Sequence, residues 1–336
     1  MIKEAISQLV EKKDLAAEVI TQTMEEIMTG SATPGQIAAF LTSLRIKGET
    51  VTEITACVQV MRRHVTKIKV KDELLLDTCG TGGDKSGTFN VSTLSALVAA
   101  AAGIKVAKHG NKSVSSKCGS ADLLMELGVK IDIEPDKMQQ CLEKVGIAFL
   151  YAPKLHPAMK YATPVRREMG IRTIFNILGP LTNPAGANCQ LLGVYDPSLT
   201  EPLANVLKNL GSRHVLVVHG DDGLDEVTTT AKTRVSELAD GRVATYKIQP
   251  KKFGITKNKP EELKGADPAY NAKLTNEILK GRADIQRGAV LLNAGCAIYA
   301  ASAVASIRDG VVKAAEAIDS GKALEKLEQL KEFTNQ

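Results

Sequence analysis

The sequence contains no tryptophan, and only 6 tyrosines and 6 phenylalanines stand among its 336 residues. Single-stranded nucleic acids stack on aromatic side chains, so this scarcity argues against a nucleic-acid-binding surface. The net charge of +5, from 43 basic and 38 acidic residues, does not demand a polyanionic partner, although it suits small anionic ligands. We therefore expect no nucleic-acid partner.

Paired cysteines and long apolar runs are missing as well. The six cysteines include no C-x-x-C pair, which argues against a zinc site or a disulfide framework and fits a reducing compartment. The alanine-rich run 94–102 is too short to span a bilayer. Residues 1–5, MIKEA, are charged and unlike a secretory signal. We expect a cytoplasmic protein with no membrane association.

The common nucleotide-binding motifs are also absent. No Gly-Lys-Ser/Thr occurs at the spacing of the Walker loop. The dinucleotide pattern G-x-G-x-x-G fails too, because its third glycine, counted from Gly80, would fall at Lys85. An ordinary nucleotide fold is therefore not supported.

What is present is a glycine-rich stretch, residues 77–93, with the sequence DTCGTGGDKSGTFNVST. It follows a short apolar run at 74–76 that is typical of a strand, and it precedes a helical run at 94–102 closed by Gly103. Glycines let a backbone approach an anion closely, and free N–H groups at a helix start favour negative charge. Asn90, Ser92 and Thr93 add side-chain donors there. The stretch predicts a phosphate site; the alternative is a turn without a ligand.

Residues 1 to about 65 predict helices alone. Asp14 is expected to cap a helix from Leu15, and Thr33 with Pro34 to start another that ends at Gly48. Such short helices bury little surface, so we expect them to pack on the rest of the chain or on a second subunit. The arginine-rich helical sequence at 158–185 is expected to join this unit.

The remainder alternates strands and helices. Strands are predicted at 104–107, 147–151, 191–195 and 215–218, β-type composition at 227–248, a surface loop at 250–268, and helices from about residue 271. This alternation predicts an α/β fold: a small all-helical N-terminal domain plus a larger α/β domain with a central, largely parallel sheet flanked by helices. The expected boundaries are 1–65 and 72–336, with a hinge at about 65–72.

A second polar loop spans residues 108–120, KHGNKSVSSKCGS, between a predicted strand and a predicted helix. It should lie at the carboxyl edge of the sheet beside the first loop, where its lysines and hydroxyls would hold a second anionic group. A polar loop without a ligand is the alternative. Two anion loops at one edge suggest a ligand with phosphates at two places.

Two charged clusters complete the pattern. Residues 219–226, HGDDGLDE, follow a buried strand, and carboxylates at that position suit Mg²⁺ bridging to phosphates. Their spacing does not fit an EF-hand, and a solvated acidic turn is the alternative. Residues 164–173 carry three arginines, of which one could receive an acidic substrate while the others form structural ion pairs.

Five runs together resemble one enzyme family. They are GTGGD at 80–84, FNVST at 89–93, KHGN at 108–111, SS at 115–116 and RTIFNILGPLTNP at 172–184. In this order they resemble anthranilate phosphoribosyltransferase, an enzyme of tryptophan biosynthesis. The resemblance covers nearly the whole chain, including the Asp225-Glu226 pair. Two acids followed by Thr-Thr-Gly-Gly, as in ordinary phosphoribosyltransferases, are absent, which points to the separate fold shared with pyrimidine nucleoside phosphorylases.

The resemblance implies a ligand for each cluster. Ser92, Asp225 and Glu226 would bind Mg²⁺, with Asp84 acting through water. Anthranilate would contact Gly80, His109, Asn111 and Arg166, and His156 and Tyr161 would line its entry. The donor, 5-phosphoribosyl 1-pyrophosphate, would be held by Gly80, Thr81, Gly82, Gly83, Asp84, Thr88, Asn90, Val91, Ser92, Thr93, Lys108, Lys112, Ser113, Val114, Ser115, Ser116 and Ser120.

The implied reaction transfers the phosphoribosyl group to the amine of anthranilate and releases pyrophosphate. No catalytic nucleophile or base is expected, and His109 is the sole weak candidate for one. The alternatives are a pyrimidine nucleoside phosphorylase of the same fold, a relative acting on another acceptor, and a non-catalytic module that binds a phosphorylated metabolite. The family resemblance also implies a homodimer formed through the helical domain.

Overall fold

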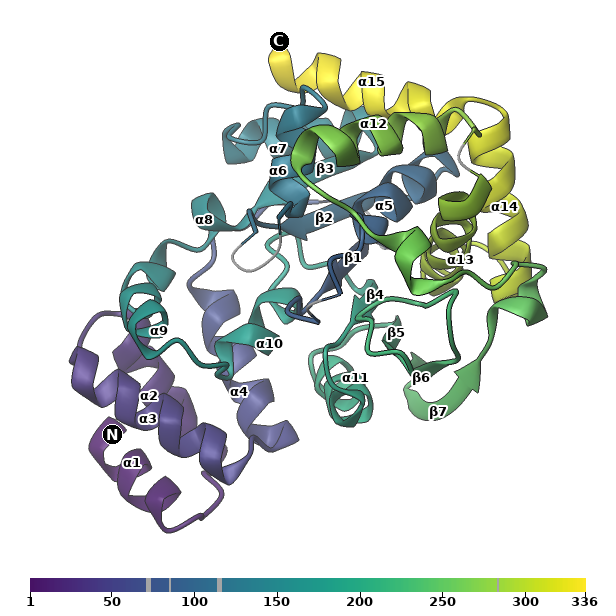
Figure 1. The fold of residues 1–336 in the computed structure, drawn as a ribbon. Helices are drawn as coiled ribbons and strands as arrows, with labels where there is room; N and C mark the ends of the chain where they lie inside the picture. Colours follow the sequence, from purple (N-terminus) through teal and green to yellow (C-terminus); the bar gives the residue numbers. More distant parts are fainter. Residues whose placement is uncertain (71–73, 85, 114–116, 283) are drawn as a thin grey trace.

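The computed structural model describes residues 1–70, 74–84, 86–113, 117–282 and 284–336. Figure 1 shows a helical part, at the lower left, and a larger α/β part. The helical part, called the helical lobe below, contains α1 (Ile2–Val10), α2 (Ala17–Met28), α3 (Pro34–Lys47), α4 (Val51–Arg63), η1 (Pro157–Lys160), α9 (Thr163–Met169) and α10 (Phe175–Leu181).

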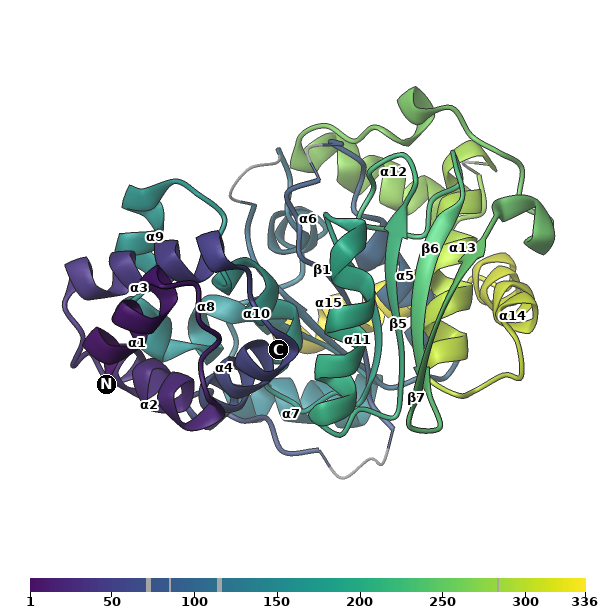
Figure 2. The ribbon, with the colours of Figure 1, turned by 90° about the horizontal axis from the view of Figure 1, so that it is seen from below.

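Segments from two distant parts of the sequence build the helical lobe. Figures 1 and 2 both place α9 and α10 beside α1–α4. One apolar cluster joins Phe40 and Leu41 of α3 with Val165 of α9 and Leu178 of α10, all buried. The same cluster continues into the α/β part through Leu203 of α11 (Thr200–Asn209). The lobe thus shares its core with one face of the sheet.

Capping residues fix where two of the N-terminal helices begin. Thr33 and Thr50 each accept the N3 amide in a capping box, and Gly48 ends α3 at φ +91°. The expected cap at Asp14 is wrong: α2 begins at Ala17 without a side-chain cap. Asp14 is exposed and instead pairs with Lys47 Nζ at 2.7 Å, and the buried Lys47 also pairs with the buried Glu53 at 2.8 Å.

The α/β part is built on one seven-stranded sheet in the order β3-β2-β1-β4-β5-β6-β7. The first five strands in this order are parallel, and β6 and β7 are antiparallel. The largely parallel sheet expected from the sequence is confirmed. The strands are β1 (Leu76–Gly80), β2 (Val106–Gly110), β3 (Ile147–Tyr151), β4 (Cys189–Gly193), β5 (His214–Gly220), β6 (Thr233–Ala239) and β7 (Arg242–Ile248).

Helices flank this sheet on both faces. Apolar side chains of α5, α13 and α15 pack in one cluster with β1 and β2, whereas α11 packs in the other cluster with β4 and β5. The helices are α5 (Val91–Ala101), α6 (Ser120–Glu126), α7 (Pro135–Val145), α8 (Ala152–Leu155), α12 (Pro268–Leu279), α13 (Asp284–Ala300), α14 (Ile307–Asp319) and α15 (Lys322–Asn335). Short 3-10 turns occupy Pro197–Leu199, Pro250–Phe253 and Pro260–Leu263.

Two strands lie further along the chain than predicted. The strand expected at 74–76 runs from Leu76 to Gly80, and the one expected at 104–107 runs from Val106 to Gly110. Polar residues at these ends are buried because neighbouring segments bond them: Asp77 Oδ1 accepts the His109 amide at 3.1 Å. In the described part of the chain, no helix is both long and apolar enough to cross a membrane.

Candidate active site

The sheet order reverses between β1 and β4, and the candidate site lies at the carboxyl ends of these two strands. In parallel sheets, such a switch point leaves a crevice where ligands bind. Gly80 and Gly193 are register partners at the two strand ends. A Cβ on Gly80 would lie 2.7 Å from Asp225 Oδ2, and one on Gly193 would collide with the Asp225 carbonyl. The two glycines therefore make the space that Asp225 occupies.

The glycine loop leaves β1 directly into this crevice. The Thr81 amide donates to the Gly193 carbonyl at 2.9 Å, and its hydroxyl accepts the Tyr195 amide at 3.1 Å. Gly82 and Gly83 follow with φ of +65° and +80°, a left-handed conformation that favours glycine. The Gly82 amide donates to Asp225 Oδ2 at 2.9 Å. The loop is thus tied to β4 and to the acidic segment.

Short polar side chains shape the rest of this loop. Asp84 accepts hydrogen bonds from the Ser86 amide at 3.1 Å and from its hydroxyl at 2.5 Å. The Ser86 hydroxyl lies 3.3 Å from that of Thr88. These contacts fold the loop on itself while leaving Asp84 and Thr88 partly exposed.

The loop ends at the N-terminus of α5, where a helix dipole favours an anion. Ser92 is partly exposed, and Glu226 accepts its backbone amide. Asn90 is the N-cap residue, but its side chain bonds neighbouring segments instead of the helix. Val91 and Thr93 are buried. Of the residues expected to hold the donor, these two and Lys108 have side chains directed into the protein.

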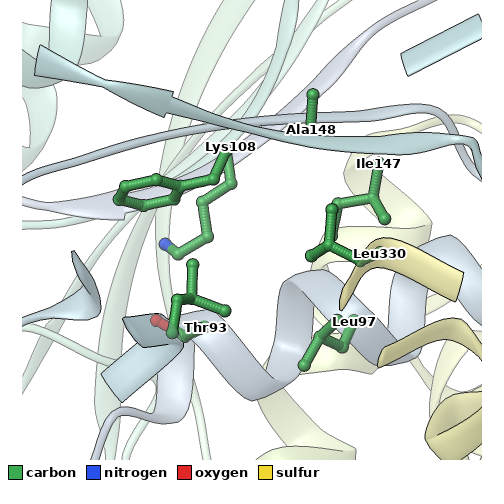
Figure 3. Close-up of a pocket in the computed structure, with 8 residues that line it drawn as sticks. Thr93, Leu97, Lys108, Ile147, Ala148 and Leu330 are labelled. Carbon is green, nitrogen blue, oxygen red and sulfur yellow. The ribbon is translucent and has the colours of Figure 1, made fainter. Parts of the chain in front are cut away.

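A small, mostly apolar cavity lies beneath this helix start (Figure 3). Thr93 borders it, and within the described residues its hydroxyl has no hydrogen-bond partner. Lys108 crosses the cavity rim and donates from Nζ to the Thr78 carbonyl at 2.5 Å and to the Ser92 hydroxyl at 3.4 Å. Burial lowers the pKa of the Lys108 ammonium. Lys108 therefore links β1 to the first turn of α5 through these two hydrogen bonds.

The second loop follows β2. Asp122 Oδ2 accepts the amides of Ser113 and Gly119, both at 2.9 Å, and so closes this loop. The Ser120 hydroxyl donates to the Asn111 carbonyl at 3.2 Å. Lys112 and Asn111 are exposed. The expected donor-binding residues Val114, Ser115 and Ser116 lie outside the described residues.

The acidic segment brings only its last two carboxylates to the glycine loop. Burial and the neighbouring Asp84 raise the pKa of Asp225, and burial and Asp225 raise that of Glu226. The earlier acids face elsewhere: Asp221 pairs with Lys247 at 2.8 Å, and Asp222 accepts hydrogen bonds from threonine hydroxyls of the following turn. Those two are structural, because their partners satisfy them.

The donor set at this position fits Mg²⁺. Asp225, Glu226 and the Ser92 hydroxyl all present oxygen, which Mg²⁺ prefers. Among the residues that the structure describes, no three His, Cys, Asp or Glu side chains gather into a closed metal site. Mg²⁺ needs no such cage, since it is usually bound by one or two carboxylates together with water and substrate phosphates. Neighbouring carboxylates whose pKa values are raised by burial and by a nearby carboxylate in this way would also be stabilised in their ionised form by a cation.

Two histidines form a neutral pair beside this site. His109 at the end of β2 lies 3.1 Å from His156, Nε2 to Nε2, and it also bonds the backbone of Gly179. One ring must donate and the other accept, so the pair holds one shared proton. Burial lowers the pKa of His109 to about 3 and that of His156 to about 4. Tyr161 is 37% exposed and packs over Gly30 of the helical lobe.

The arginines differ from one another in their partners. Arg166, half-buried on α9, lies over the Phe175 ring at 5.3 Å, and in the described part of the chain it has no ion pair or side-chain hydrogen bond. Burial lowers the pKa of its guanidinium. Arg172 forms no ion pair of the expected kind among described residues: it donates to the Gly83 carbonyl and lies over the Tyr195 ring at 4.1 Å. Arg167 also has no ion pair among the described residues, but it is exposed, so the half-buried Arg166 is the arginine best suited to an anion.

Several structural contributors escaped the sequence analysis. Asp122 has a sequence signal, because an acidic residue in the first turn of a helix favours the free amides there, and Asp122 accepts the Gly119 amide. Gly193 also has one, since a glycine at the end of an apolar strand often marks a close approach. Arg172 bonding the glycine loop has no such signal, because its partner is a backbone carbonyl 89 residues away.

Comparison with known proteins identifies the family. Residues 72–324 match the glycosyl transferase family a/b domain, and residues 3–65 match the helical bundle domain of that family. The chain is 53% identical over 335 residues to an anthranilate phosphoribosyltransferase of Acetivibrio thermocellus, covering 100% of this chain and 97% of the relative.

Solved structures agree with this match. The anthranilate phosphoribosyltransferase of Thermus thermophilus superposes with a TM-score of 0.93 at 40% identity, covering 99% of both chains. The enzyme from Saccharomyces cerevisiae in complex with PRPP and Mg superposes with a TM-score of 0.91 at 28% identity, covering 99% of this chain and 98% of the other. Sequence and fold agree over the full length, and this chain belongs to the anthranilate phosphoribosyltransferase family.

Proposed function

We propose that this chain transfers the phosphoribosyl group of 5-phosphoribosyl 1-pyrophosphate to the amine of anthranilate, giving N-(5-phosphoribosyl)anthranilate and pyrophosphate in L-tryptophan biosynthesis. The observation that carries this is the contact of Asp225 and Glu226 with the glycine loop through the amides of Gly82 and Ser92. Carboxylates so close to an anion loop suit a phosphorylated donor that binds with Mg²⁺.

The donor's phosphates are assigned to the two loops and the start of α5. Glycine amides and the helix dipole offer a fixed positive field there. Ser92, Asp225 and Glu226 would hold Mg²⁺, which supplies Lewis-acid stabilisation of charge on the pyrophosphate. Lys108 keeps Ser92 in place from below, since its ammonium reaches the Ser92 hydroxyl at 3.4 Å.

The acceptor carboxylate is assigned to Arg166. Among the residues that the structure describes, no anion pairs with this half-buried guanidinium, which offers a planar fork to a carboxylate. His109, His156 and Asn111 would line the remaining space, and Tyr161 would stand at its entrance. With a pKa of about 3, His109 is neutral at pH 7 and is too weak a base to act as the proton acceptor of the reaction.

The reaction is a single displacement. The lone pair of the neutral aromatic amine forms a bond to C1 of the ribose, the C1–O bond to pyrophosphate breaks, and pyrophosphate leaves with that electron pair. The new C–N bond leaves a proton on nitrogen that passes to solvent. Holding the two reactants in line supplies much of the rate, so the chain needs no covalent nucleophile.

A pyrimidine nucleoside phosphorylase is the second candidate. It would use phosphate as the nucleophile and would not need a site for a metal-bound pyrophosphate. The Asp225-Glu226 pair favours the phosphoribosyl donor. A non-catalytic binding module has no observation in its favour.

The proposal extends to the domain organisation, oligomeric state and location of the protein. We assign residues 1–65, joined by the helices within 158–185, to the helical domain, and residues 72–336 to the donor-binding domain. A hinge at about 65–72 would close the site; positions 71 and 72 of that segment lie outside the described residues. We further propose a homodimer through the helical domain and a cytoplasmic location.

Loss of anthranilate fluorescence tests the reaction directly. The protein is mixed with anthranilate and the phosphoribosyl donor, with and without Mg²⁺. Loss that needs protein, donor and metal together is expected. Phosphorolysis of thymidine or uridine, with no fluorescence change, would assign the chain to the phosphorylases instead.

A double variant tests the metal assignment. Asp225→Asn with Glu226→Gln should abolish turnover, because two amides cannot neutralise a divalent cation. Asp221→Asn with Asp222→Asn is the matched control, since these acids belong to the same segment but face away from the loop. Metal-dependent turnover in the first double variant would contradict the assignment.

A further inference from the structure

A buried amide on α12 connects the two anion loops from behind. Asn271 is 3% exposed and belongs to no motif of the sequence analysis. Its Nδ2 donates to Asn90 Oδ1 at 3.1 Å, and its Oδ1 accepts the Ala266 amide at 2.9 Å. Both ends of one side chain are therefore used.

Asn90 continues the connection to the second loop. Its Nδ2 donates to the Cys118 carbonyl at 3.1 Å, and its Oδ1 also lies 3.4 Å from Cys118 Sγ. Two residues later the second loop reaches Ser120 at the start of α6. A continuous hydrogen-bond path therefore runs from Ala266 through Asn271 and Asn90 to Cys118.

A short segment beside Asn271, residues 263–266, lies against the glycine loop. The Phe89 amide donates to the Leu263 carbonyl at 3.1 Å, and the Gly265 amide donates to the Gly87 carbonyl at 2.8 Å. A Cβ on Gly265 would lie 2.8 Å from both Phe89 Cα and Asn271 Oδ1. Only glycine permits this approach, so the segment fixes the outer side of the loop.

We infer that Asn271 is a positioning residue that sets the spacing of the two anion loops and thereby the affinity for the phosphoribosyl donor. The inference rests on the proposed function, because it assumes that both loops bind that donor. Asn271 itself is buried behind Asn90 and acts through it.

The chemistry of the amide explains why asparagine is needed. An amide offers a donor and an acceptor at once, whereas a carboxylate only accepts. In an Asn271→Asp variant, two oxygens would face each other at Asn90. If the Asn90 amide rotated by 180° to donate to the new carboxylate, its oxygen would face the Cys118 carbonyl. Either arrangement loses the bond to one loop.

Calorimetric titration with the phosphoribosyl donor in the presence of Mg²⁺ tests the inference. We expect the donor Kd of Asn271→Asp to rise about ten-fold, the equivalent of about 1.4 kcal/mol. The KM for anthranilate at saturating donor should change less than about two-fold, which is below the effect of losing one hydrogen bond, because the substitution acts on the donor loops. A residue that merely stabilised the fold would lower the melting temperature without this split.

Asn276→Asp is the matched control. Asn276 lies on the same helix, and its Nδ2 donates at 3.1 Å to the Ala272 carbonyl of that helix instead of to a loop. Its donor Kd should stay at the wild-type value. Gly265→Ala supplies a second variant should Asn271→Asp fail to fold, and it should also raise the donor Kd by pushing on Phe89.

The outcomes separate the two proposals. Wild-type donor affinity in folded Asn271→Asp, or in Gly265→Ala if the first variant does not fold, overturns the positioning role and leaves the proposed function intact. Failure of the wild-type protein to bind the donor overturns the proposed function, and the positioning role with it. An equal rise in Kd for Asn271→Asp and Asn276→Asp also overturns the role, because the effect would then belong to the helix.

Discussion

Acidification should destabilise this protein through the His109–His156 pair. Burial lowers the pKa of His109 from 6.5 to about 3. Between these two values the unfolded chain binds a proton that the folded chain excludes. The stabilisation is therefore complete above pH 6.5 and is lost progressively as the pH falls toward 3.

The size of the effect follows from the same two values. Taking the pH from 7 to 5 should lower the free energy of unfolding by about 2 kcal/mol through His109 alone. His156, with a pKa of about 4, acts in the same direction. The two contributions are not simply additive, because the rings share a hydrogen bond at 3.1 Å.

Urea unfolding of the wild type and of His109→Gln at pH 7 and pH 5 measures how much of the lost free energy of unfolding comes from His109. Glutamine keeps a side-chain amide near His156 and cannot take up a proton. All other titrating groups contribute to both proteins, so the loss on acidification should be about 2 kcal/mol smaller in the variant. Equal losses in the two proteins would refute the reasoning.

Proton NMR of the imidazole rings provides an independent measurement. The chain has 5 histidines, so each ring signal can be assigned by substitution. The His109 signal should stay constant from pH 7 to pH 5. A midpoint near 6.5 for His109 would show that its ring reaches water and would remove the basis of the prediction.

Three further predictions concern the site. Gly80→Ala should raise the Mg²⁺ concentration for half-maximal activity about ten-fold, because its Cβ would lie 2.7 Å from Asp225 Oδ2; Gly35→Ala, with no neighbour within 4 Å, is the control in the same metal titration. Arg166→Ala should raise the KM for anthranilate about 100-fold with little effect on the KM for the donor, and equal effects in steady-state kinetics would contradict its role. Thr93→Val should raise the free energy of unfolding in urea by about 1 kcal/mol by removing a buried hydroxyl that has no partner among the described residues, and a raised donor KM would instead indicate that this hydroxyl reaches the donor.

The sequence predicted most of the fold because its signals are local. Thr33 with Pro34 at its start and Gly48 at its end marked α3, and apolar runs marked β3 and β5. Asp14 failed as a cap because a distant lysine, Lys47, binds its carboxylate. Strand ends at Gly80 and Gly110 were missed because buried polar residues look like loop residues until their partners are known.

The candidate site was predicted in part, and family resemblance supplied its roles. The glycine loop was recognisable from composition, since few structures other than an anion loop need so many glycines and hydroxyls before a helix. The supports of the loop were not recognisable. Asn271 and Arg172 act through single hydrogen bonds across long sequence separations, and no periodicity or spacing reports such contacts.

The divided origin of the helical lobe affects how the chain folds during synthesis. From the end of α4 at Arg63 to the end of α10 at Leu181, 118 further residues must be made. At about 5–20 residues per second this takes roughly 6–24 s. Until then the surface of α3 and α4 that receives α9 and α10 stays open to water. The first helices to leave the ribosome therefore wait for segments made much later before their core is complete, and until then their uncovered apolar surface is open to premature association.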